Sequence, residues 1–161
     1  MLKDTVSQAL NDQIKHELFS AYLYLSMSAW CEANALPGAA HWFRKQASEE
    51  EEHALKLFDY VNERGGRVLL GALDAPKGEF GSALDVFEAA LAHEELVTSL
   101  IWKLYEVALA AKDYATQSML TWFIDEQVEE EANATAIVDQ LKAIGDHKGL
   151  LLSLDRTLAQ R

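Results

Sequence analysis

The sequence predicts an all-α protein in which four long helices form a bundle and a short fifth helix follows at the C-terminal end. Gly and Pro number only 8 and 2 among 161 residues, and both residue types destabilise helix interiors. Four stretches place apolar or small residues at alternating spacings of three and four, which is typical of the buried face of a helix. One polar residue interrupts each stretch near its middle: Glu17, Glu50, Glu94 and Gln127.

The first two helices are bounded by local signals. We expect the first to begin near Thr5, where the residues Thr-Val-Ser-Gln at 5–8 resemble a capping box, and to end before Pro37-Gly38. The second helix then runs to Arg64, where Gly65-Gly66 provides a C-terminal stop. The connection between these helices is short, so the pair is predicted to be an antiparallel hairpin.

Residues 66–82 contain several Gly and little periodicity, which indicates a loop before the third helix. A loop of about 17 residues can stretch to roughly 55 Å, whereas helices of about 26–30 residues are about 40–45 Å long. The loop can therefore cross the bundle from end to end, which would place the second and third helices parallel. Ser82 with Asp85 offers the N-cap of the third helix, which is expected to run to about Ala111.

The fourth helix is expected to run from Asp113 or Tyr114 to a stop at Gly145. An amphipathic segment follows, and we expect a short fifth helix over about 147–160. With the bundle over about 5–144, residues 1–161 are predicted to form a single domain. The apolar residues of the fifth helix are Leu150, Leu151, Leu152, Leu154 and Leu158.

The composition argues against several classes of protein. Half of the residues are apolar, which argues against disorder. The net charge of −12 argues against a nucleic-acid partner or an anionic membrane, and it would suit the collection of cations. Cys31 is the only cysteine, so no internal disulfide forms. No apolar run could span a bilayer and the N-terminal residues do not resemble a signal peptide, so we expect a cytoplasmic protein.

The four interrupting residues lie at one depth. Each falls about 11–13 residues into its helix, and antiparallel helices of similar length align at their midpoints, so their side chains are expected to share one layer. Burying several carboxylates without a counter-charge costs several kcal/mol per ion. The stripes contain no Lys or Arg, so metal ions are the expected counter-charge.

The neighbouring residues indicate which metal. Glu50 and His53 are three residues apart on one helical face, and Gln127 and Glu130 repeat that spacing. An oxygen-rich set with one imidazole and no thiolate favours iron or manganese. Glu17, Glu50, Glu94 and Glu130 would carry four negative charges, and two divalent ions would neutralise these charges.

Taken one at a time, these residues have simpler interpretations. The run Glu49, Glu51 and Glu52 is most simply a solvated face. His53 alone would more often be an ordinary core or surface histidine than a ligand, and Glu94 alone could reflect a wrong helix register. The coincidence of stripe and depth in all four helices favours the metal interpretation.

At these residues the chain resembles the bacterial and archaeal non-haem ferritins. The resemblance covers essentially the whole length and includes LNDQIKHELFSAYLYLSM around Glu17, EEEEHALKLFDYVNERGGRV, the His93-Glu94 helix and TWFIDEQVEEE. A ferritin-like bundle with inward Glu and Glu-x-x-His motifs is the established architecture of di-iron carboxylate proteins.

The resemblance implies roles for individual residues. Glu17, Glu50 and His53 match the first iron site of a ferroxidase centre, and Glu50 would bridge to a second iron held with Glu94 and Glu130. The other matched positions are a glutamine beside the centre, Gln127, a neighbouring tyrosine and tryptophan, Tyr24 and Trp122, and a third, cavity-side iron site made of Glu49, Glu126, Glu129 and Glu130. Packing alone could explain Trp122, and Tyr24 could also be a core tyrosine bonded to a carboxylate.

The resemblance implies an iron-storage protein that oxidises Fe(II) with dioxygen or hydrogen peroxide and stores Fe(III) mineral in a hollow homo-oligomer of about 24 subunits. The fifth helix would pack at fourfold axes, the alternative being a tail folded on its own bundle. The fourth helix has Gln127-x-x-Glu130 instead of Glu-x-x-His, so the second iron lacks an imidazole and is expected to bind more weakly.

Four alternatives were considered. A bacterioferritin would bind haem through a methionine, but Glu52 stands at the corresponding position, so no haem is expected. A DNA-coating miniferritin would place its metal between subunits. A rubrerythrin-like peroxidase usually needs a second iron–thiolate module, which one cysteine cannot build. A non-catalytic helical interaction module would not depend on Glu50.

Overall fold

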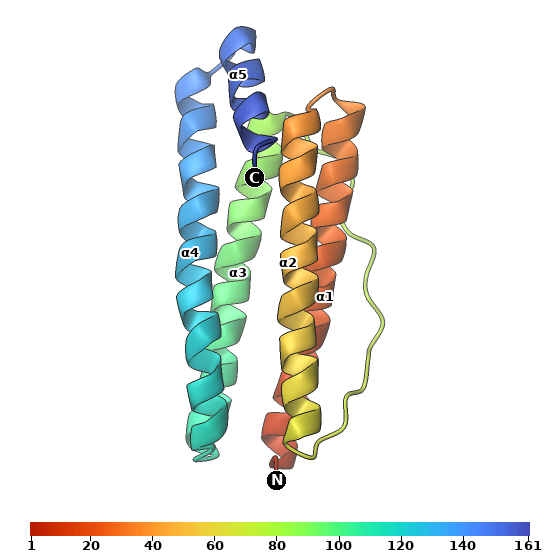
Figure 1. Cartoon of the computed structure of the whole chain (residues 1–161), viewed down its shortest axis with the longest axis vertical. Helices are drawn as coiled ribbons and strands as arrows, with labels where there is room; N and C mark the ends of the chain where they lie inside the picture. Colours follow the sequence, from red (N-terminus) through yellow and green to blue (C-terminus); the bar gives the residue numbers. More distant parts are fainter.

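The computed structural model describes residues 1–161 and contains five helices and no strand. The four long helices form a bundle, and the short fifth helix lies at one end of it (Figure 1). None of the helices is long and apolar enough to cross a membrane. The helices are α1 (Asp4–Ala33), α2 (Pro37–Glu63), α3 (Ala83–Ala110), α4 (Tyr114–Ile144) and α5 (Lys148–Leu158).

The helix ends follow the local signals at all but one position. The Ser82 side chain accepts a hydrogen bond from the Asp85 amide and caps α3, as predicted. Gly65 and Gly145 take positive φ angles of 72° and 56° directly after α2 and α4. The capping box at Thr5 was wrong: α1 begins at Asp4, and its N-cap residue makes no side-chain cap. Burial of Val6 against the bundle favours helix through this position, so Thr5 lies inside the first turn.

The long connection between α2 and α3 crosses the bundle from end to end, so α2 and α3 are parallel as predicted (Figure 1). The loop runs along α1 and is held there by side chains of that helix. The Asn11 amide group donates to the Arg67 carbonyl at 3.1 Å and accepts from the Leu69 amide at 2.7 Å. Further along, the Ser26 hydroxyl donates to the Lys77 carbonyl at 2.8 Å.

The core consists of two apolar clusters with a polar layer between them. One cluster contains Tyr24, Phe43, Phe87 and Ile137, and the other contains Ile14, Leu57, Val97 and Phe123. On each long helix, the polar residues of the central layer fall between the members of the two clusters. The regular periodicity of the helices therefore places the apolar residues in the core at both ends of the bundle and the carboxylates in its middle.

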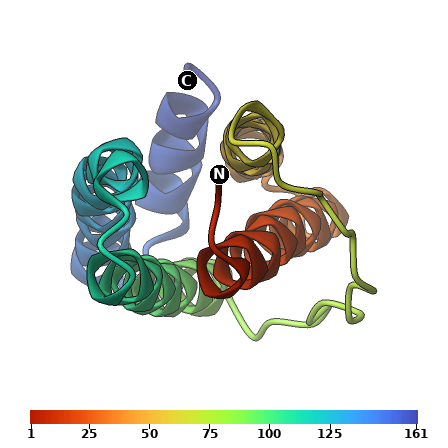
Figure 2. The ribbon, with the colours of Figure 1, turned by 90° about the horizontal axis from the view of Figure 1, so that it is seen from below.

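The two hairpins, α1–α2 and α3–α4, meet mainly through α1 and α3. No Cα atom of α2 comes within 8 Å of a Cα atom of α4. The end-on view shows this separation, with α5 lying between α2 and α4 at one end (Figure 2). We call the wider α2–α4 side of the bundle the seam.

The fifth helix packs on its own bundle. Leu154 and Leu158 are buried in the same cluster as Phe43, whereas Leu150 and Leu152 are each 50% exposed. The buried Asp155 carboxylate accepts hydrogen bonds from the Gly38 and Ala39 amides at 3.0 and 2.8 Å, and so caps α2. A Cβ atom at Gly38 would lie 1.7 Å from the Asp155 carbonyl oxygen, so this close approach requires glycine.

Candidate metal centre

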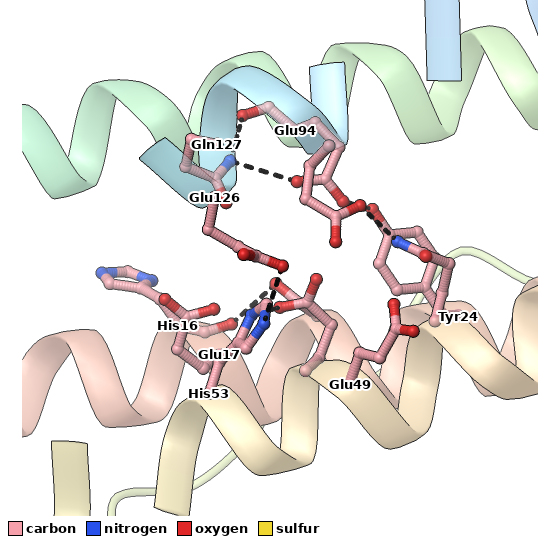
Figure 3. A network of polar contacts seen from close by, with 12 residues as sticks. His16, Glu17, Tyr24, Glu49, His53, Glu94, Glu126 and Gln127 are labelled. Atoms are coloured by element: carbon pink, nitrogen blue, oxygen red, sulfur yellow. Dashed lines mark hydrogen bonds and ion pairs between the residues drawn. The ribbon is translucent and has the colours of Figure 1, made fainter. Parts of the chain in front are cut away.

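All seven residues that were predicted to form the centre are buried in the polar layer. Their exposed fractions range from 1% for Glu17, Glu50 and Tyr24 to 5% for His53. Figure 3 labels Glu17, Tyr24, His53, Glu94 and Gln127, which come from α1, α2, α3 and α4 and point toward one another. The remaining members are Glu50 and Glu130.

Glu17, Glu50 and His53 form one group of potential ligands. Their ligand atoms lie within 4.8 Å of one another, and all three residues are buried. The His53 Nδ1 atom lies 3.4 Å from Glu50 Oε2, as the spacing of three residues on one helix allows. Two carboxylates and one imidazole nitrogen can therefore converge on one cation.

Glu94 enters the layer from α3 and is held by two side chains. The Tyr24 hydroxyl donates to Glu94 Oε1, and the Gln127 Nε2 atom lies 3.2 Å from Glu94 Oε2. Tyr24 is therefore a core tyrosine bonded to a carboxylate, and it is also the tyrosine nearest the centre. Gln127 donates to the Glu94 main-chain oxygen as well, also at 3.2 Å.

Glu130 enters from α4 and joins a second group of potential ligands. Gln46 Nε2 donates to Glu130 Oε2 at 2.8 Å. His53, Glu126 and Glu130 place ligand atoms within 4.8 Å of one another. The His53 Nε2 atom lies 3.7 Å from Glu126 Oε1, so the two ring nitrogens of His53 face carboxylates on different helices.

The electrostatics of the layer show that it lacks positive charge. Burial, and then the neighbouring carboxylates, raise the pKa values of Glu17 and Glu50 well above the ordinary range. Burial also raises the pKa of Glu94, and it raises that of Glu130 to about 7. Protons must therefore take the place of a counter-charge when no metal is bound.

Unpartnered oxygens mark where a cation fits. Both carboxylate oxygens of Glu50 and the Oε2 atom of Glu17 are buried without a hydrogen-bond donor. Buried polar atoms are rarely left unpaired in this way. Glu50 belongs to the first ligand group, and both of its oxygens accept no hydrogen bond and so are open to a cation, whereas His53 is the residue that both groups share. Hard oxygen ligands with one imidazole fit divalent iron.

A second set of acidic residues lies at the seam, outside the buried layer. We call Glu49, Glu126 and Glu129 the seam cluster; the first two are partly buried and Glu129 is exposed. Glu49 pairs with Arg161, whose Nη2 atom lies 2.6 Å from Glu49 Oε2. The Arg161 guanidinium also lies over the Trp42 ring, 4.8 Å from its centroid.

Trp122 lies beside the first ligand group. Its ring packs edge-on to the His53 imidazole with centroids 5.3 Å apart, and Lys56 Nζ lies 3.7 Å from the centroid of the Trp122 ring. Trp122 is 38% exposed, so it lies at the border between the layer and solvent. Its edge-on packing holds the imidazole in place.

Two buried polar residues at the centre were not found from the sequence. Gln13 donates to Glu17 Oε1 at 2.9 Å, and Gln46 donates to Glu130. Gln13 precedes Glu17 by four residues and Gln46 precedes Glu50 by four, so each lies on the inward face of its helix. That repeated spacing is the signal that could have identified them.

Known proteins resemble the whole chain. A family model described as a ferritin-like domain matches residues 7–144. A protein named bacterial non-heme ferritin from Staphylococcus saprophyticus is 44% identical over 100% of this chain and 96% of its own length. A protein of the same name from Staphylococcus aureus is 42% identical over 100% of this chain and 97% of its own length.

Solved structures agree with these sequence relatives. The open pore ferritin of Archaeoglobus fulgidus superposes with a TM-score of 0.99 at 46% identity, covering 100% of this chain and 99% of that one. A closed form of the same protein, engineered by mutagenesis, gives the same score and identity. The fold, the buried layer and these matches together show that the chain belongs to the ferritin family.

Proposed function

We propose that this ferritin oxidises Fe(II) as pairs of ions held in the buried layer. Iron storage and Fe(II) oxidation are the functions of the family to which the chain belongs. The first ion is assigned to Glu17, Glu50 and His53, and the second to Glu50, Glu94 and Glu130. Two ions at one bridging carboxylate can give up two electrons to one oxidant molecule, because the reactants are already held together.

One observation supports this assignment above all others. Glu50 is 1% exposed, and neither of its oxygens has a hydrogen-bond donor. A purely structural carboxylate in that position would be paired or replaced by an apolar residue. The four carboxylates of the layer carry four negative charges when ionised, so two divalent ions balance them.

The second position is proposed to bind iron more weakly than the first. In α4, Gln127-x-x-Glu130 replaces Glu-x-x-His, so Glu130 stands at the place of the histidine and α4 supplies no imidazole. Weak binding favours onward transfer of iron, whereas two tightly held ions would suit a fixed cofactor. Titration of the metal-free protein with Fe(II) under argon should therefore resolve two unequal affinities, and two equal ones would contradict the proposal.

The seam cluster is proposed as the third iron site, with Glu130 shared between it and the buried layer. Glu126 supports this role because it approaches both His53 and Glu130, while Glu49 and Glu129 are open to solvent to different degrees. Iron leaving the layer would meet these carboxylates on the side where α2 and α4 stand apart.

The assembly is proposed to be a cytoplasmic cage of about 24 copies of this single-domain chain, with dioxygen or hydrogen peroxide as the oxidant. The exposed Leu150 and Leu152 of α5 support contacts between copies, because the chain itself leaves these apolar side chains of α5 half uncovered. One size-exclusion run after adding Fe(II) in air tests this, with particle mass and protein-bound iron measured together. Hundreds of irons in a very large particle would support storage, and a small species with two irons would indicate a different enzyme.

We propose that the protein binds no haem. Glu52 is exposed and carries no thioether, so it does not supply the expected haem ligand. The absorption spectrum of the purified protein tests this statement, since a Soret band would overturn it.

A further inference from the structure

Three buried glutamines surround the carboxylate layer, and each donates its side-chain amide to a different carboxylate. Gln13 donates to Glu17, Gln46 donates to Glu130 and Gln127 donates to Glu94 (the last pair is drawn in Figure 3). Gln13 and Gln46 are only 2% and 1% exposed. Glu50, the bridging carboxylate of the proposed function, receives no such donor.

The hydrogen bonds from Gln13 and Gln46 each occupy only one oxygen of the carboxylate that accepts them. Glu17 accepts the Gln13 hydrogen bond on Oε1, 2.9 Å away, and keeps Oε2 buried and unpartnered. Glu130 accepts from Gln46 on Oε2 at 2.8 Å. In Glu17 and in Glu130, one oxygen is thus fixed by an amide while the other accepts no hydrogen bond, whereas both oxygens of Glu94 accept one, from Tyr24 and from Gln127.

Stability alone does not account for Gln46. Its Oε1 atom is buried and has no hydrogen-bond partner. An unpaired buried carbonyl costs free energy, and an apolar side chain of similar size would avoid that cost. A residue kept at such a cost is expected to serve the site and not only the packing.

The chemistry of the amide also fits this role. A Lys or Arg in the same place would hold the carboxylate but would supply the positive charge that the metal is meant to supply. A glutamine amide donates a hydrogen bond without changing the charge of the layer. Hydrogen bonds of this kind orient metal-binding carboxylates, and their loss commonly weakens metal binding about 10- to 100-fold.

We infer that Gln13 and Gln46 are positioning residues, one for each metal position: Gln13 orients Glu17 for the first ion and Gln46 orients Glu130 for the second. This inference rests on the proposed pair of metal positions. It predicts that the two glutamines act separately, because their carboxylates belong to different ions and come from different helices.

The test uses Zn(II) alone, which binds without redox chemistry, added to the assembled metal-free protein. The variants Gln13→Leu and Gln46→Leu are compared with the natural protein by calorimetric titration. Crystals soaked below saturation add the anomalous zinc occupancy of each position. Gln13→Leu should weaken the first position about 10-fold and Gln46→Leu the second about 10-fold, each leaving the other position within about twofold.

Gln8→Leu is the matched control, because Gln8 lies on α1 but is exposed and bonds only to Asp12. It should leave both positions unchanged. If a leucine variant fails to assemble, the methionine variant at the same position repeats the measurement. A general packing defect would lower the melting temperature and weaken both positions together, and that result would overturn the inference.

The proposed function is tested in the same titration. Absence of zinc from the buried layer of the natural protein would contradict the proposed pair of metal positions themselves. If both positions fill in the natural protein and neither glutamine variant changes its own position selectively, the pair stands and the inference on Gln13 and Gln46 fails.

Discussion

The buried layer and the seam cluster are built from the same residue type in two different environments. Glu17, Glu50, Glu94 and Glu130 are each at most 3% exposed, and burial raises their pKa values. In the seam cluster, the Glu49 side chain is 39% exposed and that of Glu126 is 26% exposed. Glu49 also has a cationic partner within the chain, Arg161.

The difference shows how position decides what a carboxylate does. In the layer, low solvation makes uncompensated charge costly, so a metal ion gains strongly from binding there. At the seam, water and Arg161 already compensate the charge, so a cation gains less. The layer is suited to hold iron while it reacts, and the seam is suited to pass iron on.

The largest effect that separates the two regions is expected from removing Glu50, the carboxylate proposed to bridge the two ions. Glu50→Ala should slow the first turnover of Fe(II) oxidation at least about 100-fold, because both ions lose a ligand and their alignment. Glu49→Ala, the neighbouring residue at the seam, should leave that first turnover within about threefold, since an exposed carboxylate contributes little binding energy. Stopped-flow absorbance after mixing Fe(II) with oxygenated buffer measures both rates.

Both variants must be shown to assemble as the natural protein does, by size-exclusion mass measurement. Equal rates for the two variants would show that the buried layer has no special role in oxidation.

The pH dependence of stability should come from the layer. Burial, and then the nearby Glu94 carboxylate, raise the pKa of Glu130 from its ordinary value of 4.5 to about 7 in the folded protein. A carboxyl group with a raised folded pKa gives stability that is fully present below the unfolded value and is lost as pH rises through the folded value. The metal-free protein should therefore lose about 3 kcal/mol from this group between about pH 4.5 and 7.

Thermal unfolding in chelator at several pH values measures this loss, with Glu130→Gln as the control. The variant cannot ionise at that position, so its melting temperature should fall less over the same range. If the melting temperatures of the variant and of the natural protein fell equally with pH, Glu130 would not be the cause of the loss of stability.

A smaller effect is expected from replacing one buried carboxyl group by an amide. Glu50→Gln should raise the melting temperature of the metal-free protein at pH 8 by about 3 °C or more, because it removes a group that must either be buried charged or take up a proton on folding at that pH. Glu129→Gln, on the exposed side of α4, should change it by no more than about 1 °C. Calorimetric scans in chelator compare the two, and a lower melting temperature for Glu50→Gln would contradict the cost assigned to the layer.

The smallest effect concerns the ion pair at the seam. Arg161→Gln frees Glu49 and should tighten the weakest phase of Zn(II) binding about two- to fivefold, the range expected for an exposed ion pair. Arg156→Gln is the matched control, because it removes the same charge from exposed α5 without a partner at Glu49. Identical titrations for both variants would show that Arg161 does not compete with cations.

Most of the fold and the composition of the layer followed from local sequence patterns. Helix periodicity and the stops at Gly65 and Gly145 placed the long helices, and shared depth placed Glu17, Glu50 and Glu94 together. These features are predictable because each depends on residues within one helix. The family resemblance then supplied the grouping of the residues into individual sites.

Much of the remainder depended on contacts between residues far apart in the sequence. Gln13 and Gln46 fall beside the apolar stripes and not on them, so only their spacing of four residues before Glu17 and Glu50 could have identified them. The partner of Glu49 lies 112 residues away, at Arg161. α1 begins at Asp4, within one residue of the expected start, but no capping hydrogen bond forms at Thr5.

We propose that two cations bind within the buried layer on either side of Glu50. X-ray diffraction at the iron edge, from crystals loaded with Fe(II) without oxygen, tests this arrangement most directly. We expect two anomalous peaks about 3.5–4 Å apart, one beside Glu17 and His53 and one beside Glu94 and Glu130, with Glu50 between them. A single peak, or iron only at the exposed seam residues, would contradict it.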